Sequence, residues 1–206
     1  MSLAFEQIFS IPDAFRGIPM AGRTDAWILA DAAAAHGIPR DSPGLAQFPE
    51  VYIRHLAMEI LNKGPRYGIM PGIPALLDAL ADRDDAFLAL LTGNYEAGAR
   101  LKLEHFDLWR YFPCGAFGDG AADRNGLVPN ALARVAACGG PVFAASDAIV
   151  IGDTPLDVAC AKAGGARSIA VATGNHTVGE LRESGADVVF QDLSNLEAVL
   201  QAIDQK

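Results

Sequence analysis

The chain has 206 residues, of which 51% are hydrophobic and 20% are charged, a composition that excludes an intrinsically disordered protein. Its formal net charge of −9 argues against nucleic acid as a partner, because an acidic surface repels the phosphate backbone. No apolar stretch approaches the ~20 residues of a membrane-spanning helix, and no basic, apolar leader opens the chain, so we expect a soluble cytoplasmic protein with no membrane partner. Three cysteines, Cys114, Cys138 and Cys160, match no metal or disulfide spacing and are expected to be reduced thiols.

The first part of the chain, residues 1–68, shows helical patterns and no clear strand. Residues 26–35 are rich in Ala and are followed by His-Gly-Ile-Pro, which favours a helix and then its termination. Apolar residues repeat at helical spacing over 51–62, and the Pro- and Gly-containing stretch 39–49 is expected to be a turn. These patterns predict a helical module over residues 1–68.

From residue 69 to residue 206, helices alternate with short apolar segments. Continuous apolar runs such as 86–91 are typical of parallel strands that are buried on both faces. Alternation of this kind predicts an α/β fold with a doubly wound parallel sheet. The predicted strands are 86–91, 111–117, 148–151, 168–172 and 187–190, and the predicted helices are 73–82, 96–106, 127–137, 156–163, 178–184 and 196–203.

Two carboxylates follow the predicted strand 148–151, at the edge of the sheet where such folds bind ligands. Asp153 comes directly after the strand, and Asp157 lies four residues later, on the same face of the next helix. Asp157 alone could simply cap that helix. Two converging acids also suit Mg²⁺, which prefers oxygen ligands. We therefore predict an Mg²⁺ site with Asp153 and Asp157 as ligands.

A second polar sequence, Thr92-Gly93-Asn94, follows the predicted strand 86–91. The Thr92 hydroxyl and the backbone amides of Gly93 and Asn94 could bind a phosphate at the start of the next helix. The same three residues also occur in ordinary turns and helix caps. Because both sequences follow strands of one parallel sheet, we predict a phosphate site beside the metal site.

Taken in order, Leu-Thr-Gly-Asn at 91–94 and Gly-Asp-Thr-Pro-Leu-Asp-Val-Ala-Cys-Ala-Lys-Ala-Gly-Gly at 152–165 resemble motifs II and IV of the haloacid dehalogenase (HAD) phosphatases of the phosphoglycolate-phosphatase type. Met-Pro-Gly at 70–72 and Ile-Ala-Val-Ala-Thr-Gly at 169–174 support the resemblance. It implies a HAD-like core over 69–206, a small helical cap over 1–68, and an Mg²⁺-dependent hydrolase. The implied reaction removes phosphate from small phosphorylated metabolites through an aspartyl phosphate.

The resemblance also assigns roles to individual residues. Asp153 corresponds to a metal ligand, and Asp157 to a ligand or to a group that acts through water. Thr92 corresponds to the phosphate-binding hydroxyl, with the amides of Gly93 and Asn94 beside it. The substrate itself cannot be identified in this way, because the cap determines specificity in this family.

Three basic residues are candidates for contact with the substrate. Arg124, in the sequence 122–129, is the best match to the motif III cation, although a surface-loop arginine would look the same. Lys102 is its rival, but it lies inside a predicted helix and is interpreted as structural. Arg23, in Ala-Gly-Arg-Thr-Asp at 21–25, could reach the substrate from the cap, or could serve a helix cap or an ion pair.

Motif I of the family, an apolar strand that ends in Asp-x-Asp-Gly-Thr, occurs nowhere in this sequence. The acidic sequence 82–85 precedes a strand and does not follow one. We expect that the N-terminal segment with the nucleophilic aspartate is missing and that the chain is inactive as written. The strands that end at Leu91 and Ile151 would then have unpaired edges, which we expect to be covered by repacking or by self-association.

Two alternatives to a phosphatase remain. The first is a non-catalytic relative that binds Mg²⁺ and phosphorylated ligands. The second is another HAD reaction, namely dehalogenation, phosphonate cleavage or sugar-phosphate mutation. The paired acids Asp153 and Asp157 argue against a dehalogenase, and Lys63 is the one lysine of the expected cap that a phosphonate-cleaving enzyme could use.

Overall fold

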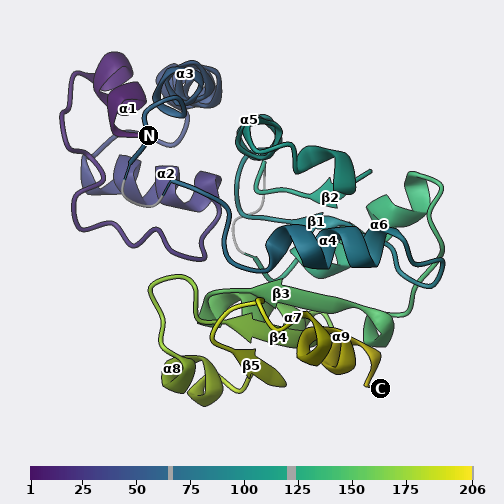
Figure 1. Ribbon diagram of the computed structural model, residues 1–206. Coiled ribbons are helices and arrows are strands. Elements are labelled where there is room, and N and C mark those ends of the chain that lie inside the picture. The colour runs from purple at the N-terminus through teal and green to yellow at the C-terminus, as the bar shows by residue number, and fades with distance from the viewer. Residues whose placement is uncertain (65–66, 120–123, 206) are drawn as a thin grey trace.

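The computed structural model describes residues 1–64, 67–119 and 124–205 (Figure 1). Helices α1 (Ser2–Phe9), α2 (Asp25–Ala35) and α3 (Pro43–Glu59) form a group at one side of the molecule, and the strands with their covering helices form the rest. No helix in these described ranges is both long enough and apolar enough to cross a membrane.

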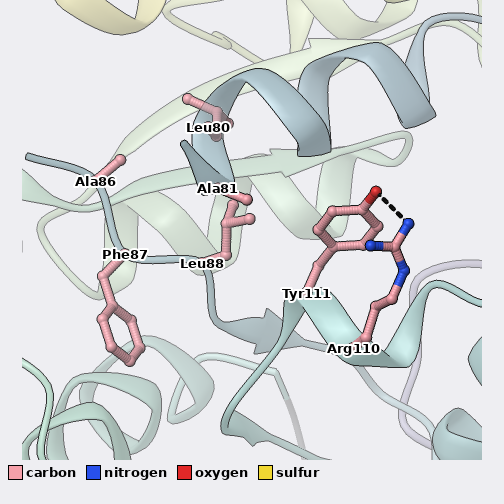
Figure 2. A pocket seen from close by; sticks show the side chains of 7 residues that line it. All are labelled: Leu80, Ala81, Ala86, Phe87, Leu88, Arg110 and Tyr111. Carbon is pink, nitrogen blue, oxygen red and sulfur yellow. Dashed lines mark hydrogen bonds between the residues drawn. The ribbon is translucent and has the colours of Figure 1, made fainter. Parts of the chain in front are cut away.

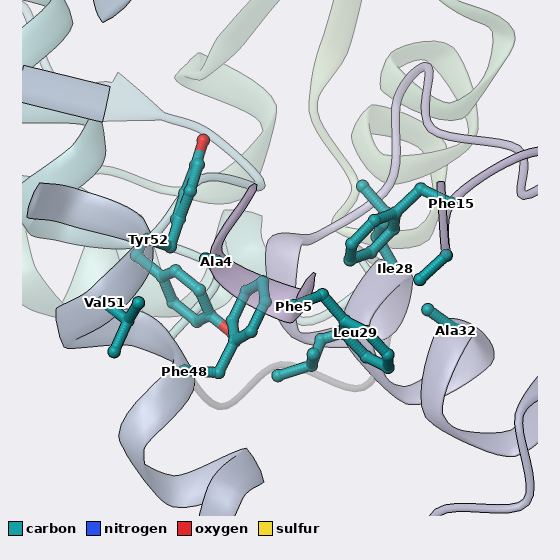
Figure 3. Packing of buried hydrophobic residues seen from close by; sticks show 11 residues of the cluster. Ala4, Phe5, Phe15, Ile28, Leu29, Ala32, Phe48, Val51 and Tyr52 are labelled. Carbon is teal, nitrogen blue, oxygen red and sulfur yellow. The ribbon is translucent and has the colours of Figure 1, made fainter. Parts of the chain in front are cut away.

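An aromatic cluster holds the three N-terminal helices together (Figure 3). Phe5 of α1 and Phe48 of α3 have no solvent-exposed surface. The Phe5 ring lies 4.7 Å from the Phe9 ring, 5.5 Å from Phe15 and 6.2 Å from Phe48, measured between centroids. These tilted and edge-on arrangements are the favourable ones for aromatic pairs.

The turn predicted over residues 39–49 is wrong in its second half, because α3 already begins at Pro43. Proline is compatible with the first turn of a helix, where its missing amide would have no intrahelical partner. Pro49 lies further inside the helix and removes one backbone hydrogen bond. Phe48 and Leu45 pack into the aromatic cluster, so tertiary burial outweighs this local cost.

The strands form two parallel sheets. The first pairs β1 (Leu90–Leu91) with β2 (Gly115–Ala116). The second contains β3 (Ile149–Gly152), β4 (Arg167–Val171) and β5 (Val188–Phe190), in that order. Parallel α/β architecture is therefore confirmed, but within the described residues no ladder joins β1 to β3.

The first two strands are shorter than the sequence predicts. Of the predicted strand 86–91 only Leu90–Leu91 is paired, and residues Trp109–Tyr111, at the start of the predicted strand 111–117, form a 3₁₀ helix instead. Strand structure requires a hydrogen-bonded partner, and the β1–β2 ladder spans only two residues on each side.

Helices cover both faces of the strands. Their bounds are α4 Ile73–Ala81, α5 Glu96–His105, α6 Leu127–Ala137, α7 Pro155–Ala163, α8 Val178–Glu183 and α9 Leu196–Asp204. Adjacent β4 residues point to opposite faces: Val171 packs with the helices α4 and α9, whereas Ala170 packs with residues of α7 and α8. Helix α6 packs with α7 over β2 and β3, and α5 follows β1.

One polar pair ties the starts of β4 and β5 together. Both the backbone amide and the hydroxyl of the buried Ser168 donate to the Asp187 carboxylate at 2.7 Å, and the Asp187 amide donates to the Ser168 hydroxyl at 3.0 Å. The Ser168 donors hold the pKa of Asp187 below its usual value. The ionised carboxylate therefore stabilises the folded state above its unfolded-state pKa, and this contribution is lost as the pH falls through the lower folded-state pKa.

We expect Asp187→Ala to lower the free energy of unfolding by about 1–2 kcal/mol at neutral pH, a value reduced for partial solvent screening. The difference from wild type should shrink as the pH falls through the acidic range, and urea unfolding at several pH values measures it. Asp84→Ala, in an exposed turn, is the control and should change stability little. A difference that stays constant with pH would contradict the electrostatic explanation.

Candidate functional site

The residues that follow β1 and β3 both contact one segment of the helical module, residues 20–25. The Asp25 amide donates to the Gly93 carbonyl at 2.7 Å. A Cβ atom on Gly93 would lie 2.3 Å from the Arg23 carbonyl oxygen, and one on Gly22 would lie 2.5 Å from the Thr154 hydroxyl. Glycine at these two positions thus permits the close approach that brings the three segments together.

A cavity of about 430 Å³ lies at this junction. It combines the predicted phosphate loop with all three basic candidates and with apolar residues of the helical module. Such a mixture of a few polar groups and an apolar wall is typical of small-molecule sites. Its lining consists of Met1, Met20, Gly22, Arg23, Asp25, Ile28, Tyr52, Leu56, Thr92, Gly93, Asn94, Lys102 and Arg124.

The phosphate loop is ordered by its own hydrogen bonds. The Asn94 amide donates to the Thr92 hydroxyl oxygen at 3.2 Å, so this amide, which the sequence suggests as a phosphate donor, is directed within the loop. The Asn94 side-chain oxygen accepts from the Lys102 ammonium at 2.9 Å. The loop therefore presents a hydroxyl and a lysine to the same cavity.

Asp25 anchors the helical module to the phosphate loop. Its carboxylate accepts from the Tyr95 amide at 2.9 Å and from the Asn94 side-chain amide at 3.4 Å, and the residue is 3% exposed. Burial raises the pKa of Asp25, while the Tyr95 amide and the nearby Lys102 oppose the rise. Burial also lowers the pKa of Lys102, and Asp25 opposes that shift. The two groups thus partly compensate each other at the cavity wall.

The sequence analysis assigned no role to Asp25 and named Lys102 only as the rival of Arg124. Asp25 was passed over as part of a cap sequence, and Lys102 was interpreted as structural. A signal for Asp25 existed, because Arg-Thr-Asp directly before an apolar helix places three polar residues at a helix start. The charge of Lys102 made it a candidate, but its place at the cavity depends on tertiary packing, which brings α5 to the cavity wall.

Two glycines leave space for the side chains of both predicted metal ligands. A Cβ on Gly152 would lie 2.5 Å or less from Asp157 side-chain carbons, and one on Gly174 would lie 2.2 Å from an Asp153 carboxylate oxygen. Burial raises the pKa of Asp153, and the neighbouring charge of Asp157 adds to the rise. Two acids at one strand end repel each other, an arrangement that a bound cation would relieve.

The two carboxylates differ in what they already bind. One oxygen of Asp157 accepts from the Thr154 amide at 3.0 Å and from its hydroxyl at 2.7 Å, and the other binds Arg124. Among the described residues, the Asp153 carboxylate accepts a hydrogen bond from its own backbone amide and from no other side chain, and the charges of Arg124 and His176 lie near it. Asp153 thus fits a direct metal ligand, whereas Asp157 fits an orienting residue.

Arg124 links the strand end to the cavity. Its guanidinium binds the Asp157 carboxylate and donates to the Gly22 carbonyl at 3.2 Å. Its Nε is buried and has no hydrogen-bond partner among the described residues. Residues 122 and 123 of the predicted motif III segment lie outside the described ranges. Asp153 does not line the cavity itself and is connected to it through Asp157 and Arg124.

Arg23 lines the cavity, but its side chain is held by residues of α2, the helix that follows it. It forms an ion pair of 2.6 Å with Asp31 and lies 4.3 Å above the Trp27 ring. The ion pair considered in the sequence interpretation is therefore present. The guanidinium remains part of the cavity wall, so a role in binding substrate stays a prediction.

Asp153 and Asp157 are the predicted ligands for a metal ion. Within residues 1–64, 67–119 and 124–205, no group of three or more His, Cys, Asp or Glu side chains could enclose a metal ion. Mg²⁺ does not require such a cage, because it is commonly held by one or two carboxylates together with water and substrate phosphate. Asp153 and its surroundings are compatible with that mode.

A second hollow of about 320 Å³ lies at the opposite end of β1, where the strands begin (Figure 2). Arg110 donates to the Tyr111 hydroxyl at 2.8 Å, and the Tyr111 hydroxyl in turn binds Asp78. The remaining lining residues are apolar: Leu80, Ala81, Ala86, Phe87 and Leu88. None of the predicted site residues lines this hollow.

Comparison with known proteins gives consistent matches. Residues 126–196 match the family model described as HAD-hydrolase-like. The chain is 31% identical over 182 residues to a phosphoglycolate phosphatase of Rhodospirillum rubrum, covering 86% of this chain and 72% of that protein.

Solved structures resemble the chain over almost its whole length. A hydrolase from Pseudomonas syringae superposes with a TM-score of 0.67 at 19% identity, covering 99% of this chain and 91% of the other. A predicted phosphoglycolate phosphatase from Haemophilus somnus 129PT superposes with a TM-score of 0.68 at 14% identity, covering 97% and 88%. At these identities the two structures bear on the fold alone.

Proposed function

The chain belongs to the HAD superfamily of hydrolases and is phosphoglycolate-phosphatase-like, and from this premise we propose that it provides the metal and phosphate sites of an Mg²⁺-dependent phosphatase acting on small phosphorylated metabolites. The observation that carries the proposal is the joint placement of the Thr92 loop, Lys102 and Arg124 around one cavity. The name of the Rhodospirillum rubrum relative makes phosphoglycolate the first substrate to test.

In this proposal each group has a physical task. The Thr92 hydroxyl donates to a phosphoryl oxygen, and the cations neutralise the charge that develops during transfer. Asp153 would hold Mg²⁺, which supplies Lewis-acid stabilisation of the phosphoryl oxygens when bound. Asp157 keeps Arg124 oriented through their ion pair. Residues of the helical module form one wall of the cavity, and this wall would limit the access of water to the phosphoryl group.

We assign direct contact with the phosphoryl group to Lys102 as well as to Arg124. Two bonds, to Asp157 and to the Gly22 carbonyl, restrain Arg124, whereas Lys102 reaches the cavity beside the phosphate loop. Lys102→Met keeps the alkyl stem and removes the charge. We expect it to lower kcat/KM roughly 10²-fold in the form that turns over. Lys162→Met, on α7 and bonded to the Ser184 carbonyl, is the matched control. Equal activity of the two variants would exclude a phosphoryl contact for Lys102.

The nucleophile is the part that this sequence does not contain. We propose that hydrolysis through an aspartyl phosphate requires a strand with Asp-x-Asp-Gly-Thr, and that this chain is inactive without it. The separation of the β1–β2 and β3–β5 sheets supports the proposal, as does the 37% exposure of Ile151 in β3, since strands in the middle of a parallel sheet are normally buried. Without that strand, we expect the exposed edges to promote self-association.

The deciding experiment compares this chain with a version extended upstream to include any in-frame Asp-x-Asp-Gly-Thr. Both are assayed with p-nitrophenyl phosphate and a panel of phosphorylated metabolites, with and without Mg²⁺. Mg²⁺-dependent turnover by the extended form alone is the expected result. If the extended form is folded and binds Mg²⁺ but hydrolyses nothing, the chain is a non-catalytic relative. Size exclusion that shows this chain as a stable monomer would argue against self-association.

A further inference from the structure

Two of the three cysteines lie side by side, away from the candidate site. Cys114 directly precedes β2, and Cys138 is the residue at which α6 ends. The Cys138 side chain lies close enough to interact with the Cys114 thiol, at the end of the sheet where α6 finishes its packing on β2. Cys114 is half-buried and Cys138 is exposed, whereas Cys160 is buried elsewhere in the core. The spacing of the cysteines in the sequence gave no indication of this pairing.

Regular structure fixes both positions. The Leu90 amide donates to the Cys114 carbonyl at 3.0 Å, which ties Cys114 to the β1–β2 ladder. The Cys138 amide donates to the Arg134 carbonyl at 2.9 Å, which closes the last turn of α6. Helix α6 itself packs on β2 through buried residues that include Ala116 and Val128. The two thiols are therefore held together by a sheet and a helix, not by chance contact of mobile loops.

We propose that Cys114 and Cys138 are a redox pair that forms an intramolecular disulfide when the protein meets hydrogen peroxide. In the first step the Cys138 thiolate attacks one peroxide oxygen, which breaks the O–O bond and yields a sulfenic acid and water. In the second step the Cys114 sulfur attacks the Cys138 sulfur and displaces the hydroxyl, which leaves as water after taking the thiol proton. Overall, two thiols are oxidised to one disulfide and one peroxide is reduced to two waters.

The environments of the two thiols determine the order of these steps. Burial, and then contact with Cys138, raise the pKa of Cys114 to about 11, so this thiol is rarely ionised near neutral pH. Cys138 is the solvent-accessible member, and access by the oxidant favours the exposed sulfur. Cys138 is therefore the first to be oxidised, and Cys114 is the resolving thiol.

The bond would constrain a segment that reaches the candidate site. The residues between the two cysteines include Arg124, which binds Asp157, and Gly118, at which a Cβ would lie 2.0 Å from the Gly93 carbonyl oxygen. Closure of this loop therefore ties the amino end of β2 to the end of α6 and restricts the segment that places Arg124. Formation of this disulfide does not require catalytic turnover, so it can be tested on this chain without an activity assay.

The test treats the folded chain with hydrogen peroxide, blocks the remaining thiols with an alkylating agent, and maps the peptides by mass spectrometry. The expected product is one peptide pair joined between Cys114 and Cys138, lighter by two hydrogens and separable by dithiothreitol. Cys114→Ser should abolish the link and allow dimedone to trap a sulfenic acid on Cys138, while Cys160→Ser should leave the link intact. Recovery of both cysteines in alkylated form after oxidation, or disulfides formed only between molecules, would overturn the proposal.

Discussion

Asp153→Ala is expected to lower kcat/KM of the extended, catalytically competent form by roughly 10³-fold, which corresponds to about 4 kcal/mol of transition-state stabilisation. The physical reason is that Asp153 is the carboxylate at the end of β3 that remains available to a cation, whereas Asp157 is already bound to Thr154 and Arg124. Steady-state kinetics over a range of Mg²⁺ concentrations measures the effect, which should include a loss of Mg²⁺ dependence.

The matched control for this substitution is Asp192→Ala. Asp192 lies two residues beyond the parallel strand β5, but its carboxylate already accepts a hydrogen bond from the Ser194 amide at 2.9 Å. Its removal should leave kcat/KM nearly unchanged. If Asp153→Ala retained full Mg²⁺-dependent activity while circular dichroism showed a native fold, the metal assignment would be wrong.

The largest effect on stability is expected at Phe5. Phe5→Ala should lower the free energy of unfolding by about 3–5 kcal/mol, because the change removes a fully buried ring and leaves a cavity between α1, α2 and α3. Figure 3 shows the ring among the side chains of all three helices. Chemical denaturation followed by tryptophan fluorescence suits the measurement, since Trp27 lies in α2.

A matched control is available on the same helix. Leu3 is 47% exposed, so Leu3→Ala should change stability by about 0.5 kcal/mol or less. If Phe5→Ala and Leu3→Ala unfolded at the same denaturant concentration, the aromatic cluster would not stabilise the helical module. Since Asp25 anchors this module to the phosphate loop, loss of the cluster should also weaken ligand binding at the cavity.

Two contacts, that of Lys102 with Asn94 and that of Cys114 with Cys138, show what sequence patterns do not predict. Lys102 lies eight residues beyond Asn94, yet their side chains meet at 2.9 Å, and both residues line the cavity. Cys114 precedes β2 and Cys138 ends α6. Only the packing of α6 on β2 brings these two positions together. The spacing of apolar residues predicts which face of a helix or strand is buried, but not which other element packs against that face.

Sequence patterns alone predict the alternation of helices and parallel strands, the polar residues at the ends of β1 and β3, and the family resemblance. These features are local, since apolar runs, glycines and acids at a strand end occupy consecutive positions. The extent of the strands, the start of α3, the burial of Asp25 and the ion pair between Arg124 and Asp157 become visible only in the folded protein. Each of these depends on a partner distant in the sequence, because ladders, buried charges and core contacts exist only where two segments meet.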